Sequence, residues 1–310
     1  MQTYSHSGAV PIGGAITTLL ASLATAVIGG FIYAYAFCWI PFVYINFLIT
    51  LAYGIAIGVT VSLMAKRGHV RNNTFLWLSA VVAGFVGLYF YWAAYLWALA
   101  GIGQVGLLAL WPPTLVEFGE QLFQKGSWGI KGDNISGWIL VAFWIAEAGL
   151  VLWMATAIAL TDAHRPYCES CNTWTDVEQG VAKLAATGDE PAWQPLLAGD
   201  LPSLAAFPPA ESGAKQFVRL DVARCPRCAQ SRFLTIHSVQ ITVDKKDNET
   251  TKEKPLVINA ILTPSQFAVV EACAELYRQG PIVPATDETP AESIPADESQ
   301  PPGESPEGYA

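Results

Sequence analysis

The sequence predicts an α-helical membrane bundle of four transmembrane helices, followed by a small α+β soluble domain and a disordered tail. The chain is 52% hydrophobic and 14% charged, whereas about a quarter of the residues in a soluble domain are charged. The imbalance is local, because residues 1–160 hold five of the 17 Lys and Arg and four of the 26 Asp and Glu. The second half instead carries two Cys-x-x-Cys pairs, Cys168/Cys171 and Cys225/Cys228.

Four stretches of the membrane domain (1–160) reach the roughly 20 apolar residues that cross ~30 Å of hydrocarbon. They are about 15–38, 42–64, 74–98 and 136–160. The first has no basic flank and is too long for a signal-peptide core, so we expect it to stay in the mature protein. The second follows it after a tight turn, which predicts an antiparallel hairpin.

Basic residues predict the orientation of the chain. Lys66, Arg67 and Arg71 crowd the second loop, which the positive-inside bias places in the cytoplasm. With four spans both termini are then cytoplasmic, in a multi-pass protein of the bacterial inner (plasma) membrane. A reducing cytosol keeps thiols free, so paired cysteines there favour a metal site over disulfides.

The outer loop, 99–135, contains one helical pattern. Pro112 and Pro113 can open a helix, and apolar residues from Leu115 to Phe123 recur on one side before Gly126 ends it. We expect an amphipathic helix that lies on the outer membrane face or packs on the bundle. A ligand-gating role is a further alternative.

The soluble domain, 161–280, combines strands, a helix and an insertion. The 53 residues 172–224 separate the cysteine pairs and predict a helical insertion, with helix-compatible stretches at 176–187 and 192–205. Alternating apolar residues predict strands at 217–222, 233–243 and 256–262, with 244–254 as a hairpin loop. Thr263 and Pro264 predict the start of a helix that runs to about Gln279. Residues 281–310 hold seven acids and no base among many prolines, which predicts a disordered acidic tail.

Cys168, Cys171, Cys225 and Cys228 can supply the four thiolates of a closed tetrahedral site. Cys225-Pro-Arg-Cys228 resembles the second knuckle of zinc-ribbon proteins and, more faintly, of rubredoxins. Ala229 stands where rubredoxins usually have Gly, and the insertion is wider than in either. We expect structural zinc ahead of iron, with a dithiol redox pair as the remaining alternative. Cys38 and Cys273 are expected to be buried apolar residues.

Glu147 lies near the middle of the fourth span, where a charge is costly. Its depth points to the hydroxyls of Tyr53 and Tyr89 as partners, since no Lys, Arg or His occurs in a span. We favour a structural hydrogen bond over a proton or ion pathway. Gly54 and Gly58 predict close helix approach and permit an oligomer. An interfacial aromatic belt is expected at Tyr91, Trp92, Tyr95 and Trp97.

Basic residues surround the second cysteine pair, with Asp221 opposing them. They are Lys215, Arg219, Arg224, Arg227 and Arg232. Such a patch can contact anionic lipid headgroups, although scattered solvated charge explains it as well. Nucleic acid is disfavoured because few aromatic residues are interleaved.

The whole arrangement resembles four-span bacterial membrane proteins with a zinc-ribbon-like cytosolic domain, a likeness that implies no activity. The first hypothesis is a non-catalytic protein of the lipid bilayer whose cytosolic domain binds a protein partner. A small transporter or channel component that uses Glu147 is the second. A membrane-bound oxidoreductase with a rubredoxin-like iron or dithiol centre is the third.

Overall fold

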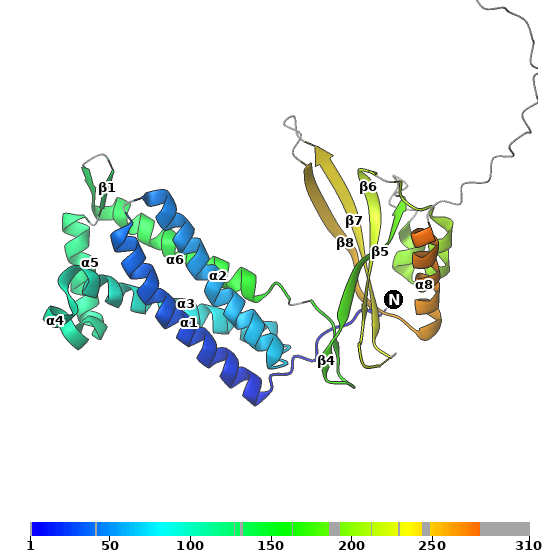
Figure 1. Cartoon of the computed structure of the whole chain (residues 1–310), viewed down its shortest axis with the longest axis horizontal. Coiled ribbons are helices and arrows are strands. Elements are labelled where there is room, and N and C mark those ends of the chain that lie inside the picture. Colours follow the sequence, from blue (N-terminus) through cyan, green and yellow to red (C-terminus); the bar gives the residue numbers. More distant parts are fainter. Residues whose placement is uncertain are drawn as a thin grey trace, which may run out of the picture.

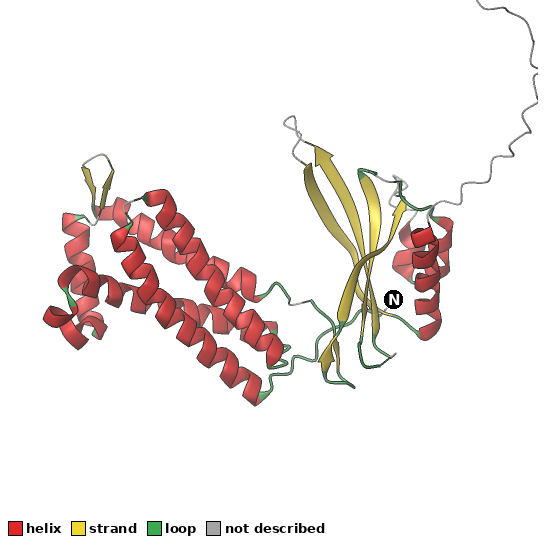
Figure 2. Cartoon of the chain, viewed as in Figure 1, coloured by secondary structure: helices red, strands yellow, loops and turns green. Residues whose placement is uncertain are grey.

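The computed structural model describes residues 2–40, 42–126, 128–130, 133–162, 164–185, 193–211, 213–228, 230–243 and 249–279. The predicted tail, 281–310, lies outside these residues. A helical bundle occupies one half of the molecule and a sheet covered by helices the other (Figure 1). Figure 2 shows the same division by secondary structure, with the strands of the large sheet all in the second half.

Four long helices form the bundle. They are α1 (Ile12–Trp39), α2 (Val43–Arg67), α3 (Asn73–Ala100) and α6 (Gly137–Ala159). Each is long and apolar enough to cross a membrane, which confirms the four predicted spans. These four candidate spans indicate a multi-pass membrane protein.

Small residues let the helices approach closely, as the sequence predicted. A Cβ on Gly58 of α2 would lie 2.6 Å from the Ala155 carbonyl oxygen of α6. A Cβ on Gly30 of α1 would lie 2.8 Å from the Gly87 carbonyl oxygen of α3. Backbones in contact at these points gain van der Waals packing, which drives helix association in lipid.

The predicted aromatic belt is wrong for two of its members. Tyr91 and Tyr95 are buried inside the bundle, with their rings stacked at a centroid distance of 6.1 Å. Trp92 meets Trp144 of α6 edge to face at 4.9 Å. Packing of these rings inside the bundle outweighs the preference of aromatic side chains for the membrane interface.

The segment between α3 and α6 lies at the end of the bundle away from the large sheet (Figure 1). It contains α4 (Ile102–Val105), η1 (Gly106–Leu110), α5 (Pro112–Lys125), β1 (Trp128–Ile130) and β2 (Asp133–Ile135). The predicted amphipathic helix is α5, which ends at Gly126 with φ +80°. Phe118 and Leu122 bury its apolar side against the bundle. Of the two placements expected, the structure shows packing on the bundle.

The soluble half is built on a four-stranded antiparallel sheet of order β5-β6-β7-β8. Its strands are β5 (Asp176–Ala185), β6 (Gln216–Arg224), β7 (Arg232–Val243) and β8 (Glu249–Ile261). One face packs against α7 (Gln194–Ala198), η3 (Leu201–Ala206) and α8 (Pro264–Gln279) around a core that includes Leu220, Leu234 and Leu204. The three predicted strands and the final helix are confirmed.

The helix predicted within 176–187 is wrong, because residues 176–185 form the edge strand β5. β5 pairs with β6, and an irregularity between Glu178 and Ala182 is accommodated by Gly180 at φ +67°. Pairing with a neighbouring strand overrides helix propensity here. Among its described residues the insertion 172–224 thus contains more strand than helix, with short helical pieces at α7 and η3. The hairpin loop expected at 244–254 is also shorter, since β8 begins at Glu249.

Residues 2–10 form a strap between the two halves, which the sequence analysis missed. Thr3 bridges Ala260 of β8, and the Tyr4 amide donates to the Asn259 carbonyl oxygen at 2.9 Å. Further along, the Arg71 amide donates to the Ala9 carbonyl oxygen at 2.9 Å. The strap thereby ties the edge strand β8 to the loop between α2 and α3.

The orientation stays a prediction, and cysteine labelling tests it. Glu120 on α5 and Asp176 on β5 are both exposed, and these two elements lie beyond opposite ends of the bundle (Figure 1). We expect a membrane-impermeant maleimide to label Glu120→Cys in intact cells and Asp176→Cys after permeabilisation, each measured against the native cysteines. If Asp176→Cys alone were labelled in intact cells, the predicted orientation would be wrong.

Candidate metal centre

The first cysteine knuckle is the turn of a minimal hairpin. β3 (Tyr167–Cys168) pairs with β4 (Thr173–Trp174). The turn closes through Asn172, which adopts a left-handed φ of +50° and whose side-chain oxygen accepts the Tyr167 hydroxyl. Asn tolerates this conformation better than most residues. The turn brings Cys168 and Cys171 to the same side.

The second knuckle is the turn between β6 and β7. The last ladder pair is Arg224 with Arg232, and the Cys225 amide donates to the Ser231 carbonyl oxygen at 3.0 Å. The Arg227 amide points at the Cys225 sulfur at 3.4 Å. Backbone donors aimed at sulfur are typical of thiolate knuckles.

The two knuckles bring the four predicted cysteines together. All four Sγ atoms lie within 4.8 Å of one another, and those of Cys168 and Cys228 are 3.7 Å apart. A tetrahedral ion with bonds of ~2.3 Å to sulfur holds its ligands about 3.8 Å apart. None of the four is in a disulfide. The cluster is therefore positioned to bind a metal ion.

The surroundings of the sulfurs favour thiolates at two positions. Backbone donors at Gln230 and Ser231 lower the pKa of Cys228 to about 6. Burial opposes ionisation of Cys168, but the Ser231 hydroxyl, which donates to its sulfur at 3.1 Å, helps to lower its pKa. Hydrogen bonding to Cys228 raises the pKa of Cys171 to about 12. If all four thiols ionise, a metal cation bound among the sulfurs would compensate their negative charge.

No likeness to a known protein adds to this description. Comparison of the chain with protein-family models, curated proteins and solved structures found no match. Any conclusion about function therefore rests on the residues of the site and their geometry.

The first knuckle also docks onto the bundle. The Trp174 indole nitrogen donates to the Lys66 carbonyl oxygen at 2.8 Å, and the Arg71 guanidinium lies 4.1 Å from the centre of the Tyr167 ring. Arg71 also pairs with Glu169 at 3.3 Å. Two of the three basic residues that predicted the orientation, Lys66 through its backbone and Arg71 through its side chain, thus contact the knuckle. Metal site and interdomain junction share one hairpin.

Two of the five residues of the basic patch predicted near the second knuckle are paired with acids. Arg219 bonds Asp221 and Glu253, and Arg224 pairs with Glu178 at 3.7 Å. Arg232 lies 4.3 Å from the centre of the Phe267 ring. Lys215 and Arg227 have no acidic partner within the described residues. Asp221 is therefore one of three acids that oppose the patch, with Glu253 and Glu178, and contact with anionic lipid headgroups stays a prediction.

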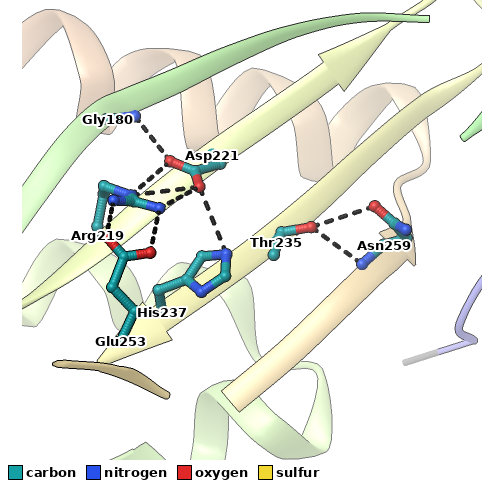
Figure 3. Close-up of polar contacts among 7 residues, drawn as sticks. All are labelled: Gly180, Arg219, Asp221, Thr235, His237, Glu253 and Asn259. Carbon is teal, nitrogen blue, oxygen red and sulfur yellow. Dashed lines mark hydrogen bonds and ion pairs between the residues drawn. The ribbon is translucent and has the colours of Figure 1, made fainter. Parts of the chain in front are cut away.

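A polar ladder crosses the sheet on the face away from its helices (Figure 3). Arg219 lies between Asp221 at 3.0 Å and Glu253 at 2.6 Å, and His237 approaches Asp221 at 3.5 Å. The Gly180 amide donates to the buried Asp221 at 2.7 Å, which closes the irregularity in β5. A separate pair, Thr235 with Asn259, continues the row. These bonds stabilise strand register.

Glu147 has partners other than those predicted. The hydroxyls of Tyr33 and Tyr91 bond to its carboxylate. Tyr53 instead donates to the Ala26 carbonyl oxygen at 2.7 Å, and Tyr89 to the Leu110 carbonyl oxygen at 2.5 Å. Helix rise alone gives a position along each helix, but the direction in which each helix faces decides the contact. Cys38 and Cys273 are half-buried.

Proposed function

We propose that the protein is a non-catalytic component of the bacterial inner membrane whose cytosolic domain is an interaction and assembly module. A structural zinc ion on Cys168, Cys171, Cys225 and Cys228 holds that module together. One observation carries the proposal, namely that the first knuckle is at once half of the cysteine cluster and the surface docked on the α2–α3 loop.

The donor set supports a structural role. Four thiolates complete the coordination of zinc and leave no position for water or substrate. The polar ladder likewise supports scaffolding, because Arg219 and Asp221 are engaged with each other and with neighbouring strands. Because the first knuckle docks on the bundle, the sheet keeps a defined position relative to it. A module that recruits a protein partner to the membrane needs that property.

Elemental analysis of the full-length chain in detergent tests the metal. We expect close to one zinc per chain, and less than a tenth of that in Cys168→Ser or Cys228→Ser. Cys273→Ser, on α8 away from the cluster, is the matched control and should keep the metal.

Two results would overturn this assignment. A red preparation that contains iron would favour the rubredoxin-like alternative. A folded, metal-free protein with the four cysteines in disulfides would exclude a structural metal.

A further inference from the structure

The bundle contains a cavity of about 260 Å³ that the proposed function does not use. It lies next to the point where α2 and α6 touch at Gly54 and Gly58, on the side away from the soluble domain. Phe47 of α2 and Phe143 of α6 both line it and are 54% and 44% exposed. The cavity therefore opens sideways toward lipid between these two helices.

A carboxylate without a basic partner lines this cavity. Glu147 accepts hydrogen bonds from Tyr33 and Tyr91, and the Tyr33 hydroxyl lies 2.7 Å from that of Thr50. Among the four spanning helices the basic residues are Lys66 and Arg67, at the far end of α2. Hydroxyl donors stabilise the carboxylate but leave its charge uncompensated. A cation that enters the cavity would compensate it.

A second polar side chain lines the same cavity. The side-chain oxygen of Asn46 is buried and has no donor within the described residues. Its amide nitrogen is held by the Ile40 carbonyl oxygen at 3.2 Å, which fixes the orientation of the group. An unsatisfied buried acceptor costs about 1–3 kcal/mol. A ligand with an N–H group would remove that cost.

Aromatic rings form the remaining walls. Trp92 and Trp144 meet edge to face at 4.9 Å, and Tyr95 lies beside them. Such rings bind apolar groups and attract cations through their faces. Ligand pockets commonly combine walls of this kind with a few placed polar groups.

We propose that this cavity binds a small lipophilic amine in its protonated form. The ammonium group pairs with Glu147 and donates to Asn46, while the apolar part lies among the rings. Glu147 is ten residues along α6, ~15 Å from its start, too deep for a lipid headgroup. The ligand is therefore a free amine that enters from the lipid, and the proposal is independent of the metal site.

Equilibrium dialysis of the full-length protein in detergent tests the ligand class. The probes are 2-phenylethylammonium, its neutral counterpart 2-phenylethanol, and phenyltrimethylammonium, which carries charge without an N–H. We expect 2-phenylethylammonium to bind at least tenfold more tightly than 2-phenylethanol. The affinity of phenyltrimethylammonium should lie between the two. Equal binding of the amine and the alcohol by the native protein would overturn the proposal without any variant.

Substitutions then locate the site. Glu147→Gln should lower the affinity for 2-phenylethylammonium at least tenfold and leave that for 2-phenylethanol unchanged. Asn46→Leu should reduce the difference in affinity between 2-phenylethylammonium and phenyltrimethylammonium. Glu120→Gln, an exposed acid on α5, is the matched control and should bind like the native protein. Unchanged amine binding in Glu147→Gln, in a variant with native melting temperature, would place the amine elsewhere.

Discussion

Replacing both cysteines of the second knuckle, Cys225→Ser with Cys228→Ser, is expected to unfold the soluble domain while the bundle stays folded. Structural zinc contributes about 10–16 kcal/mol in zinc-finger peptides, which is as large as the roughly 5–15 kcal/mol that typically separates folded from unfolded domains. The first knuckle is especially dependent on metal, because β3 and β4 share two residue pairs. Hairpins of that size are not stable alone.

Limited proteolysis and near-ultraviolet circular dichroism of the full-length variant measure this effect. We expect cleavage between residues 165 and 279 at protease concentrations that leave the native chain intact, with the four helices protected by detergent. A chelator should produce the same pattern in the native protein, and zinc should reverse it. Cys273→Ser is the control that keeps all four proposed ligands. Native-like protease resistance in the double variant would show that the metal does not hold the domain together.

Gly58→Val is expected to separate α2 from α6 and to destabilise the bundle. The new Cβ would lie 2.6 Å from the Ala155 carbonyl oxygen and 2.8 Å from the Ile158 Cβ. The first contact is with backbone, so a rotamer change cannot relieve it and α6 must move. Overpacking in a tight core costs about 1–3 kcal/mol, occasionally more.

Thermal unfolding in detergent, followed by tryptophan fluorescence, measures the loss. Gly149→Val on α6 is the matched control, since a Cβ there meets nothing within 4 Å. The two variants change helix propensity and hydrophobicity alike, so their difference in melting temperature isolates the contact. Similar melting temperatures for both would mean that α2 and α6 do not touch at Gly58.

The parts of this structure that sequence could predict are those with local signals. Apolar length located the four helices, and the spacing within each Cys-x-x-Cys pair located the knuckles. Alternating or clustered β-branched and apolar residues located β6 and β7, and buried residues follow one another directly in both strands.

The parts that sequence could not predict depend on partners far along the chain. β5 has helix-compatible composition and becomes a strand because β6 lies beside it. Glu147 bonds Tyr33, 114 residues away, and periodicity could not show that the two helices turn these side chains toward each other. The strap of residues 2–10 carries no repeating pattern, and its hydrogen bonds to β8 and to Arg71 join backbone atoms, which composition does not reveal.

That strap has a consequence for biosynthesis. Ala260, which Thr3 bridges, is made about 250 residues after it, roughly 10–50 s later at typical rates of synthesis. The strap must therefore stay unpaired until the last strand of the sheet has been made. This pairing closes late in folding, and a bulky tag fused next to the strap would compete with the closing step.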